Sequence, residues 1–159
     1  SEFMKVPENM LYTVTEKISD MHAALVEVFS IGFHACNRAG VSEDDRIVIW
    51  GAGKVGQSIL QAARTKTRNT VVMVDILDER LAFAQKAYND IYIVNAANTN
   101  AVEKIRELTG GEGVDIAFEA VGHTKEIPGV INPVRGCVQA IRGQAKYVYW
   151  DFHLNHLPS

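Results

Sequence analysis

Gly51, Gly53 and Gly56 have the spacing of a phosphate-binding loop. They stand in the segment GAGKVG, which follows the apolar run 47–50. In such a loop the first glycine permits a tight turn, the second lets a diphosphate approach the backbone, and the third lets the next helix pack against the strand. The N-terminus of that helix then offers unpaired N–H groups and a partial positive charge to phosphates. The alternative is a simple tight turn between a strand and a helix.

An acidic residue after the next apolar run favours the phosphate-binding interpretation. Asp75 follows the run 71–74, about 20 residues beyond the glycines, where a carboxylate can accept hydrogen bonds from an adenosine ribose. Its charge repels a 2′-phosphate, so NAD is favoured over NADP. Asp75 could instead cap the next helix, and Lys54 could be a solvated side chain. Strand, glycines, helix and acid together predict dinucleotide binding.

The elements that must position these residues alternate along the chain. Apolar runs predict buried strands at 47–50, 71–74, 91–94, 114–118 and 147–150. Helical patterns lie between them, and one precedes them from Asp20, a plausible N-cap, to Gly40, with Gly32 as a candidate break. This alternation predicts an α/β fold: a doubly wound parallel sheet with helices on both faces, the Rossmann fold. Residues 123–145 show no clear pattern. After the fifth strand no sixth strand is visible, so we expect the fold to be truncated at the sixth strand.

Composition narrows the class of partner. The 159 residues fit one domain, and 47% hydrophobic with 22% charged residues is typical of a globular protein. A net charge of −3 disfavours nucleic acid, and the apolar runs are too short for a membrane span. Cys36 and Cys137, far apart in the chain, are interpreted as reduced thiols of a cytoplasmic protein. Residues 1–3 are interpreted as a cloning remnant, 4–19 as a lead-in and 20–159 as the dinucleotide-binding domain.

Several stretches, in order and spacing, match one known family. They are AALVEVFSIGFHACNRAGV (23–41), GAGKVG (51–56), VDILDERLAFA (74–84), LTGGEGVDIAFEAVG (108–122) and, more loosely, VRGCV (134–138). On these the chain resembles the zinc-type medium-chain alcohol dehydrogenases, and within them the polyol (sorbitol) dehydrogenases. The resemblance covers residues 20 to 122. It implies the NAD-binding domain of such an enzyme, with the catalytic zinc domain absent from the chain.

The resemblance implies roles around the adenosine end of the cofactor. Val55 would donate its backbone N–H to the pyrophosphate, and Asp75 would hold the adenosine ribose. Ile76 would lie beside the adenine, and Arg80 would pack over the adenine ribose. The alternative for Arg80 is a surface ion pair with a neighbouring acid.

Further roles implied by the resemblance concern the nicotinamide end and the metal. Ala120 and Val121 would line the cofactor groove, although ordinary apolar packing also explains them. Ser30 would approach the nicotinamide, or cap a helix. Glu27 matches the position of a glutamate at the catalytic zinc of polyol dehydrogenases, and a carboxylate is an acceptable zinc ligand. An isolated glutamate on a helix is otherwise a solvated residue.

The implied activity belongs to the intact enzyme. There, zinc would act as a Lewis acid on an alcohol or polyol, which would exchange a hydride with the nicotinamide. We expect no catalytic residue in this chain and no turnover by it alone, and a homo-oligomer is left open. The alternative function is a non-catalytic nucleotide-sensing Rossmann module, which also uses a glycine loop and an acid. A short-chain dehydrogenase is disfavoured because no tyrosine is followed four positions later by lysine.

Overall fold

A parallel β-sheet forms the centre of the molecule. The structure, a computed structural model, describes residues 4–122 and 126–149. In these ranges five strands, all paired in parallel, follow the order β3-β2-β1-β4-β5. The strands are β1 (Ile47–Trp50), β2 (Val71–Asp75), β3 (Tyr92–Asn95), β4 (Val114–Glu119) and β5 (Ile141–Tyr149). The predicted α/β fold is confirmed, and the expected truncation concerns residues 150–159, which lie outside the described ranges.

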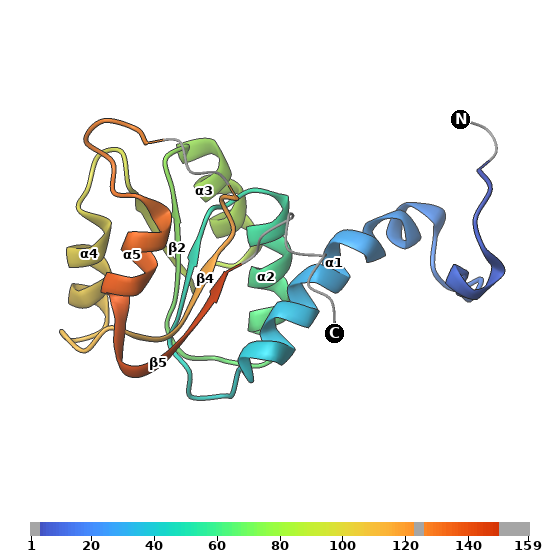
Figure 1. The fold of residues 1–159 in the computed structure, drawn as a ribbon, viewed down its shortest axis with the longest axis horizontal. Coiled ribbons are helices and arrows are strands. Elements are labelled where there is room, and N and C mark those ends of the chain that lie inside the picture. Colours follow the sequence, from blue (N-terminus) through green and yellow to red (C-terminus); the bar gives the residue numbers. More distant parts are fainter. Residues whose placement is uncertain (1–3, 123–125, 150–159) are drawn as a thin grey trace.

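Helices cover both faces of the sheet (Figure 1). They are α1 (Asp20–Ala39), α2 (Lys54–Arg64), α3 (Asp78–Ala87), α4 (Ala101–Leu108) and α5 (Pro133–Ala140). Ile47 and Ile49 of β1 pack in a buried cluster with α1, α2 and α3. Val48 and Trp50 pack in a second cluster with α4 and α5. Burial on both faces explains why the central strands are continuous apolar runs.

The register of the strands aligns the carboxyl ends of β1, β2 and β4. Trp50, the last residue of β1, lies opposite Val74 of β2 and Glu119 of β4. The chain order reverses between β1 and β4. In open α/β sheets, ligands bind in the crevice at the carboxyl ends of the strands beside such a reversal. The loops after β1, β2 and β4 therefore converge where a ligand is expected.

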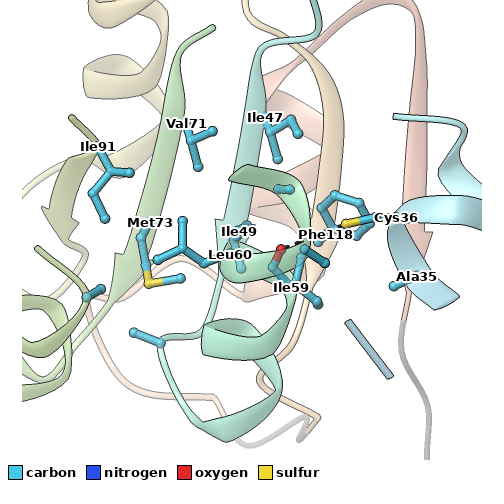
Figure 2. Close-up of a cluster of buried hydrophobic side chains, with 14 of the residues drawn as sticks. Ala35, Cys36, Ile47, Ile49, Ile59, Leu60, Val71, Met73, Ile91 and Phe118 are labelled. Carbon is cyan, nitrogen blue, oxygen red and sulfur yellow. Dashed lines mark hydrogen bonds between the residues drawn. The ribbon is translucent and has the colours of Figure 1, made fainter. Parts of the chain in front are cut away.

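Helix α1 is continuous, so the expected break at Gly32 is wrong. A Cβ atom on Gly32 would lie 2.3 Å from the backbone oxygen of Ser58, so glycine here permits close packing of α1 on α2. Figure 2 shows a second contact between α1 and α2, in which the Cys36 thiol donates to the carbonyl oxygen of Ile59 at 3.8 Å. The N-cap is Ser19 and not Asp20, because the Ser19 side chain accepts a hydrogen bond from the His22 N–H. Gly40 ends the helix with φ 64°, as predicted.

The lead-in and the C-terminal part differ in regularity from the rest. Residues 4–19 contain only a short 3-10 helix, η1 (Glu8–Met10), and extend away from the sheet beyond α1 (Figure 1). Helix α5 was not predicted, and β5 begins at Ile141 where we expected it at Tyr147. A register shift between Val114 and Ile116 of β4 interrupts the β5 pairing, which hides the strand period in the sequence.

No helix in the described ranges has the length and apolar character of a membrane span.

Candidate functional site

A cleft of about 1270 Å³ opens at the carboxyl ends of the strands. This exceeds the range of about 300–1,000 Å³ typical of small-ligand pockets, so a molecule of dinucleotide size has room. Most of the residues predicted to contact a cofactor line it. They are Gly51, Gly53, Val55, Asp75, Ile76, Arg80 and Val121, together with Lys54 and Ala120. Elements far apart in the chain therefore bring the predicted set to one place.

Three residues considered in the sequence do not line the cleft. Gly56 lies beneath the loop, where it contacts the loop backbone. Glu27 is an exposed residue of α1. Ser30 lies inside α1, where its hydroxyl donates to the carbonyl oxygen of Glu27 at 2.7 Å, so it is not a cap at a helix break.

The three glycines of the loop meet different surroundings. A Cβ atom on Gly56 would lie 1.8 Å from the carbonyl oxygen of Gly51, so the fold itself excludes any larger residue. Gly51 has φ 103°, and a Cβ atom there would lie 2.9 Å from the carbonyl oxygen of Ala120. Gly53 has φ −73°, which any residue adopts. A Cβ atom on Gly53 would meet only the Arg80 guanidinium, at 3.9 Å. The protein's own packing therefore requires glycine at 51 and 56 but not at 53.

The start of α2 is suited to an anion. Gly53 is its N-cap and offers no side chain to the free N–H groups of the first turn, which also contains no acidic residue. These N–H groups and the helix dipole make the turn electropositive. The cations of Lys54, Arg80 and Arg135 also line the cleft. Together they offset the negative charges of a diphosphate.

The Asp75 carboxylate is buried and held by backbone groups. Its Oδ2 accepts a hydrogen bond from the Ala52 N–H at 2.6 Å. Its Oδ1 accepts from the N–H groups of Ile76 at 2.7 Å and Leu77 at 3.0 Å. The Arg80 guanidinium lies 3.9 Å from Oδ2, in an ion pair that is half exposed on the arginine side. Asp75 thus ties the glycine loop to the end of β2, and the N-cap of α3 is Leu77.

The opposite wall of the cleft was missed in the sequence. It consists of residues 126–135, which run from the loop after β4 into α5. Before this wall, Glu119 holds the residues that follow β4, because its Oε1 accepts hydrogen bonds from the N–H groups of Val121 at 2.7 Å and Gly122 at 3.3 Å. The only local signal was the pair Asn132 and Pro133, an N-cap followed by a proline at the first helical position.

The described residues do not form a zinc site. No group of three His, Cys, Asp or Glu side chains that could hold a metal ion occurs within 4–122 and 126–149. A catalytic zinc requires about three protein ligands, and Glu27 supplies at most one. Both cysteines in these ranges are free thiols buried in the core. The donor set therefore does not fit a metal.

Comparisons with known proteins identify relatives of this chain. A family model described as zinc-binding dehydrogenase matches residues 55–135. The erythritol/L-threitol dehydrogenase of Mycolicibacterium smegmatis is 33% identical over 136 residues, or 85% of this chain and 37% of that protein. The sorbitol dehydrogenase of Bacillus subtilis is 30% identical, over 84% of this chain and 38% of that protein. The chain thus spans little more than a third of the length of these relatives.

Solved structures share the fold. A zinc-dependent alcohol dehydrogenase from Streptococcus pneumonia superposes with a TM-score of 0.77 and 30% identity, over 92% of this chain and 41% of that one. An alcohol dehydrogenase from Escherichia coli CFT073, solved with NADH, gives a TM-score of 0.79 at 24% identity, over 94% of this chain and 42% of that one. At that identity the second likeness concerns the fold alone.

Proposed function

This chain belongs to the zinc-binding dehydrogenase family, of which it forms the cofactor-binding domain, and we propose that its cleft binds NAD. Gly53 carries the proposal. No neighbouring atom and no backbone angle requires glycine there. A side chain at 53 would instead enter the mouth of the cleft, beside the free N–H groups of α2. A ligand that must touch this backbone explains the residue, and a diphosphate is the chemical group that such a turn binds.

Different lining residues would contact different parts of the cofactor. The Val55 N–H and the first turn of α2 would bind the diphosphate. Asp75 would accept a ribose hydroxyl, because an ionised carboxylate offers about four lone-pair positions and backbone N–H groups occupy three of them here. Ile76 and Arg80 would flank the adenosine. The negative charge of the Asp75 carboxylate would repel the 2′-phosphate of NADP.

The other wall would receive the nicotinamide. Ala120 and Val121 lie across the cleft from α3 and would contact it, with the segment 126–135 covering the groove. When bound, the nicotinamide ring supplies the hydride chemistry. The protein residues bind it, orient it and limit access of water.

For the whole protein we propose oxidation of an alcohol or polyol. The support is that the relatives named above act on erythritol, threitol and sorbitol. The described residues hold no metal site, so no step through zinc is assigned to this chain. The role of Glu27 at the catalytic zinc of the intact enzyme stays a prediction. We expect this chain alone to bind cofactor without turnover. We also propose a cytoplasmic location, since Cys36 and Cys137 are free and buried. No feature of the cleft favours the regulatory-module alternative.

Isothermal titration with NADH and NADPH tests the proposed function. We expect NADH to bind the chain at least about tenfold more tightly than NADPH, a difference of about 1.4 kcal/mol. Heat exchange with neither nucleotide, or a clear preference for NADPH, would contradict the proposal.

A further inference from the structure

Gln57 joins the two elements that form the adenosine side of the cleft. It lies in the first turns of α2 and is half-buried. Its side-chain amide donates to the carbonyl oxygen of Ala52 in the glycine loop at 3.2 Å, and to the carbonyl oxygen of Arg80 in α3 at 3.3 Å. The same nitrogen lies 3.9 Å from the Met73 sulfur. Gln57 is not among the residues that line the cleft, so any effect on a ligand passes through its partners.

Both backbone polar groups of Ala52 are therefore held by hydrogen bonds to side chains. Its N–H donates to the Asp75 carboxylate at 2.6 Å, and its carbonyl oxygen accepts from Gln57. Ala52 itself is buried. The glycine loop, the end of β2 and the first turn of α3 thus form one hydrogen-bonded unit. Because Gln57 reaches both Ala52 and Arg80, it fixes the position of α3 relative to the loop.

We infer that Gln57 is a positioning residue that sets the discrimination between NAD and NADP, an inference that rests on the proposed function. Arg80 and Asp75 have opposite effects on a 2′-phosphate, because the guanidinium attracts it and the carboxylate repels it. With α3 tied to the loop, the Arg80 guanidinium stays near Asp75, at 3.9 Å. Without the tie, Arg80 can move towards a 2′-phosphate and the loop can loosen around a diphosphate. NADH affinity then falls, while the attraction between Arg80 and the 2′-phosphate makes the loss of NADPH affinity smaller.

Gln57→Met tests this role with little change in shape. Methionine keeps the length and the helix propensity of glutamine but removes both N–H donors. Gln61→Met is the matched control, because Gln61 lies one turn further along α2, is also half-buried, and does not line the cleft. Gln57→Glu replaces the amide donor by a negative charge, so its carboxylate would be repelled by the carbonyl oxygens of Ala52 and Arg80.

The titrations should separate positioning from a merely structural role. We expect Gln57→Met to bind NADH about tenfold more weakly than the unchanged chain, because the loop and α3 are then less preorganised for the ligand. Its NADPH affinity should fall by less than about threefold, and Gln57→Glu should lose more NADH affinity than Gln57→Met. Gln61→Met should match the unchanged chain. Equal losses for NADH and NADPH, or no loss of NADH binding, would overturn the inference.

Hydrogen exchange in the free chain keeps this inference separate from the proposed function. In Gln57→Met, backbone amides of residues 51–54 and 78–81 should exchange faster than in Gln61→Met, with no nucleotide present. If the unchanged chain binds neither nucleotide, the proposed function fails, and with it the role of Gln57 in selecting the cofactor. Unaltered exchange in these segments would refute the tie itself, whatever the chain binds.

Discussion

The two walls of the cleft are held in different ways. The wall formed by the glycine loop and α3 follows regular strands, and hydrogen bonds from Asp75 and Gln57 tie its parts together. The wall formed by residues 126–135 is an irregular segment that leads into the eight-residue helix α5. In α5, Gly136 packs so closely on the sheet that a Cβ atom there would lie 2.3 Å from the Trp50 ring. Hydrogen bonds to backbone groups hold the first wall, whereas α5, at the end of the second wall, is held against the sheet by side-chain packing.

Gly56→Ala should have the largest effect, because it acts on the backbone of the first wall. The added methyl group would lie 1.8 Å from the Gly51 carbonyl oxygen, and backbone on both sides leaves little room to adjust. We expect a loss of about 3 kcal/mol or more in the free energy of unfolding. Urea denaturation followed by circular dichroism measures it. Unchanged stability would show that α2 is not packed against the loop as described.

Gly53→Val should weaken NADH binding much more than it lowers stability. Its side chain has space in the protein but would occupy the mouth of the cleft. Since valine is a poorer N-cap than glycine, we expect the free energy of unfolding to fall by about 1 kcal/mol or less, and the NADH affinity to fall about a hundredfold, or 2.7 kcal/mol. Titration calorimetry and denaturation on the same sample give both values. Retained NADH binding would mean that no ligand approaches Gly53.

Gly136→Ala should have an intermediate effect on the second wall. The methyl group would press on the buried Trp50 ring, and overpacking costs about 1–3 kcal/mol. Since alanine favours the helix by up to about 1 kcal/mol, the net loss should be about 1–2 kcal/mol. Adding Trp50→Phe to the variant should restore part of that loss in urea denaturation. A double variant less stable than both single variants would contradict this account of the wall.

The smallest effect concerns pH and the two core thiols. Burial raises the pKa of Cys36 from 9.0 to about 11, against a smaller opposing effect of Lys66. Burial, with the negative charge of Glu119, raises the pKa of Cys137 further. Thiols of the unfolded chain ionise above about pH 9, whereas the folded ones stay protonated. The free energy of unfolding should therefore fall as pH rises, by about 1 kcal/mol per thiol between pH 9 and 10.

Denaturation of the unchanged chain and of Cys36→Ala at these two pH values isolates the contribution of one thiol. The pH-dependent loss should be smaller in the variant. An equal loss in both proteins would show that Cys36 ionises alike in the folded and unfolded states.

The difference between the walls also decides what the sequence reveals. Local backbone geometry requires glycine at 51 and 56, and Asp75 ends a strand at a fixed spacing from them in the sequence. The first wall could therefore be predicted. Helix α5, which ends the second wall, depends on the close packing of Gly136 against the Trp50 ring, a contact between residues far apart in the chain that only the tertiary structure shows. A helix of eight residues shows too little period to recognise. The hydrogen bonds from Ala52 to Asp75 and from Gln57 to Arg80 also join residues far apart in the chain, so the sequence pattern does not indicate them.

Amide chemical shifts during an NADH titration test the central claim most directly. In the isotope-labelled 159-residue chain, the N–H signals of Gly53, Lys54 and Val55 should move progressively and saturate together. Signals at the opposite end of the sheet, such as that of Ile47, should stay in place. If NADH leaves the three loop signals unmoved at saturating concentration, the diphosphate does not lie against the start of α2, and the cleft is not its site.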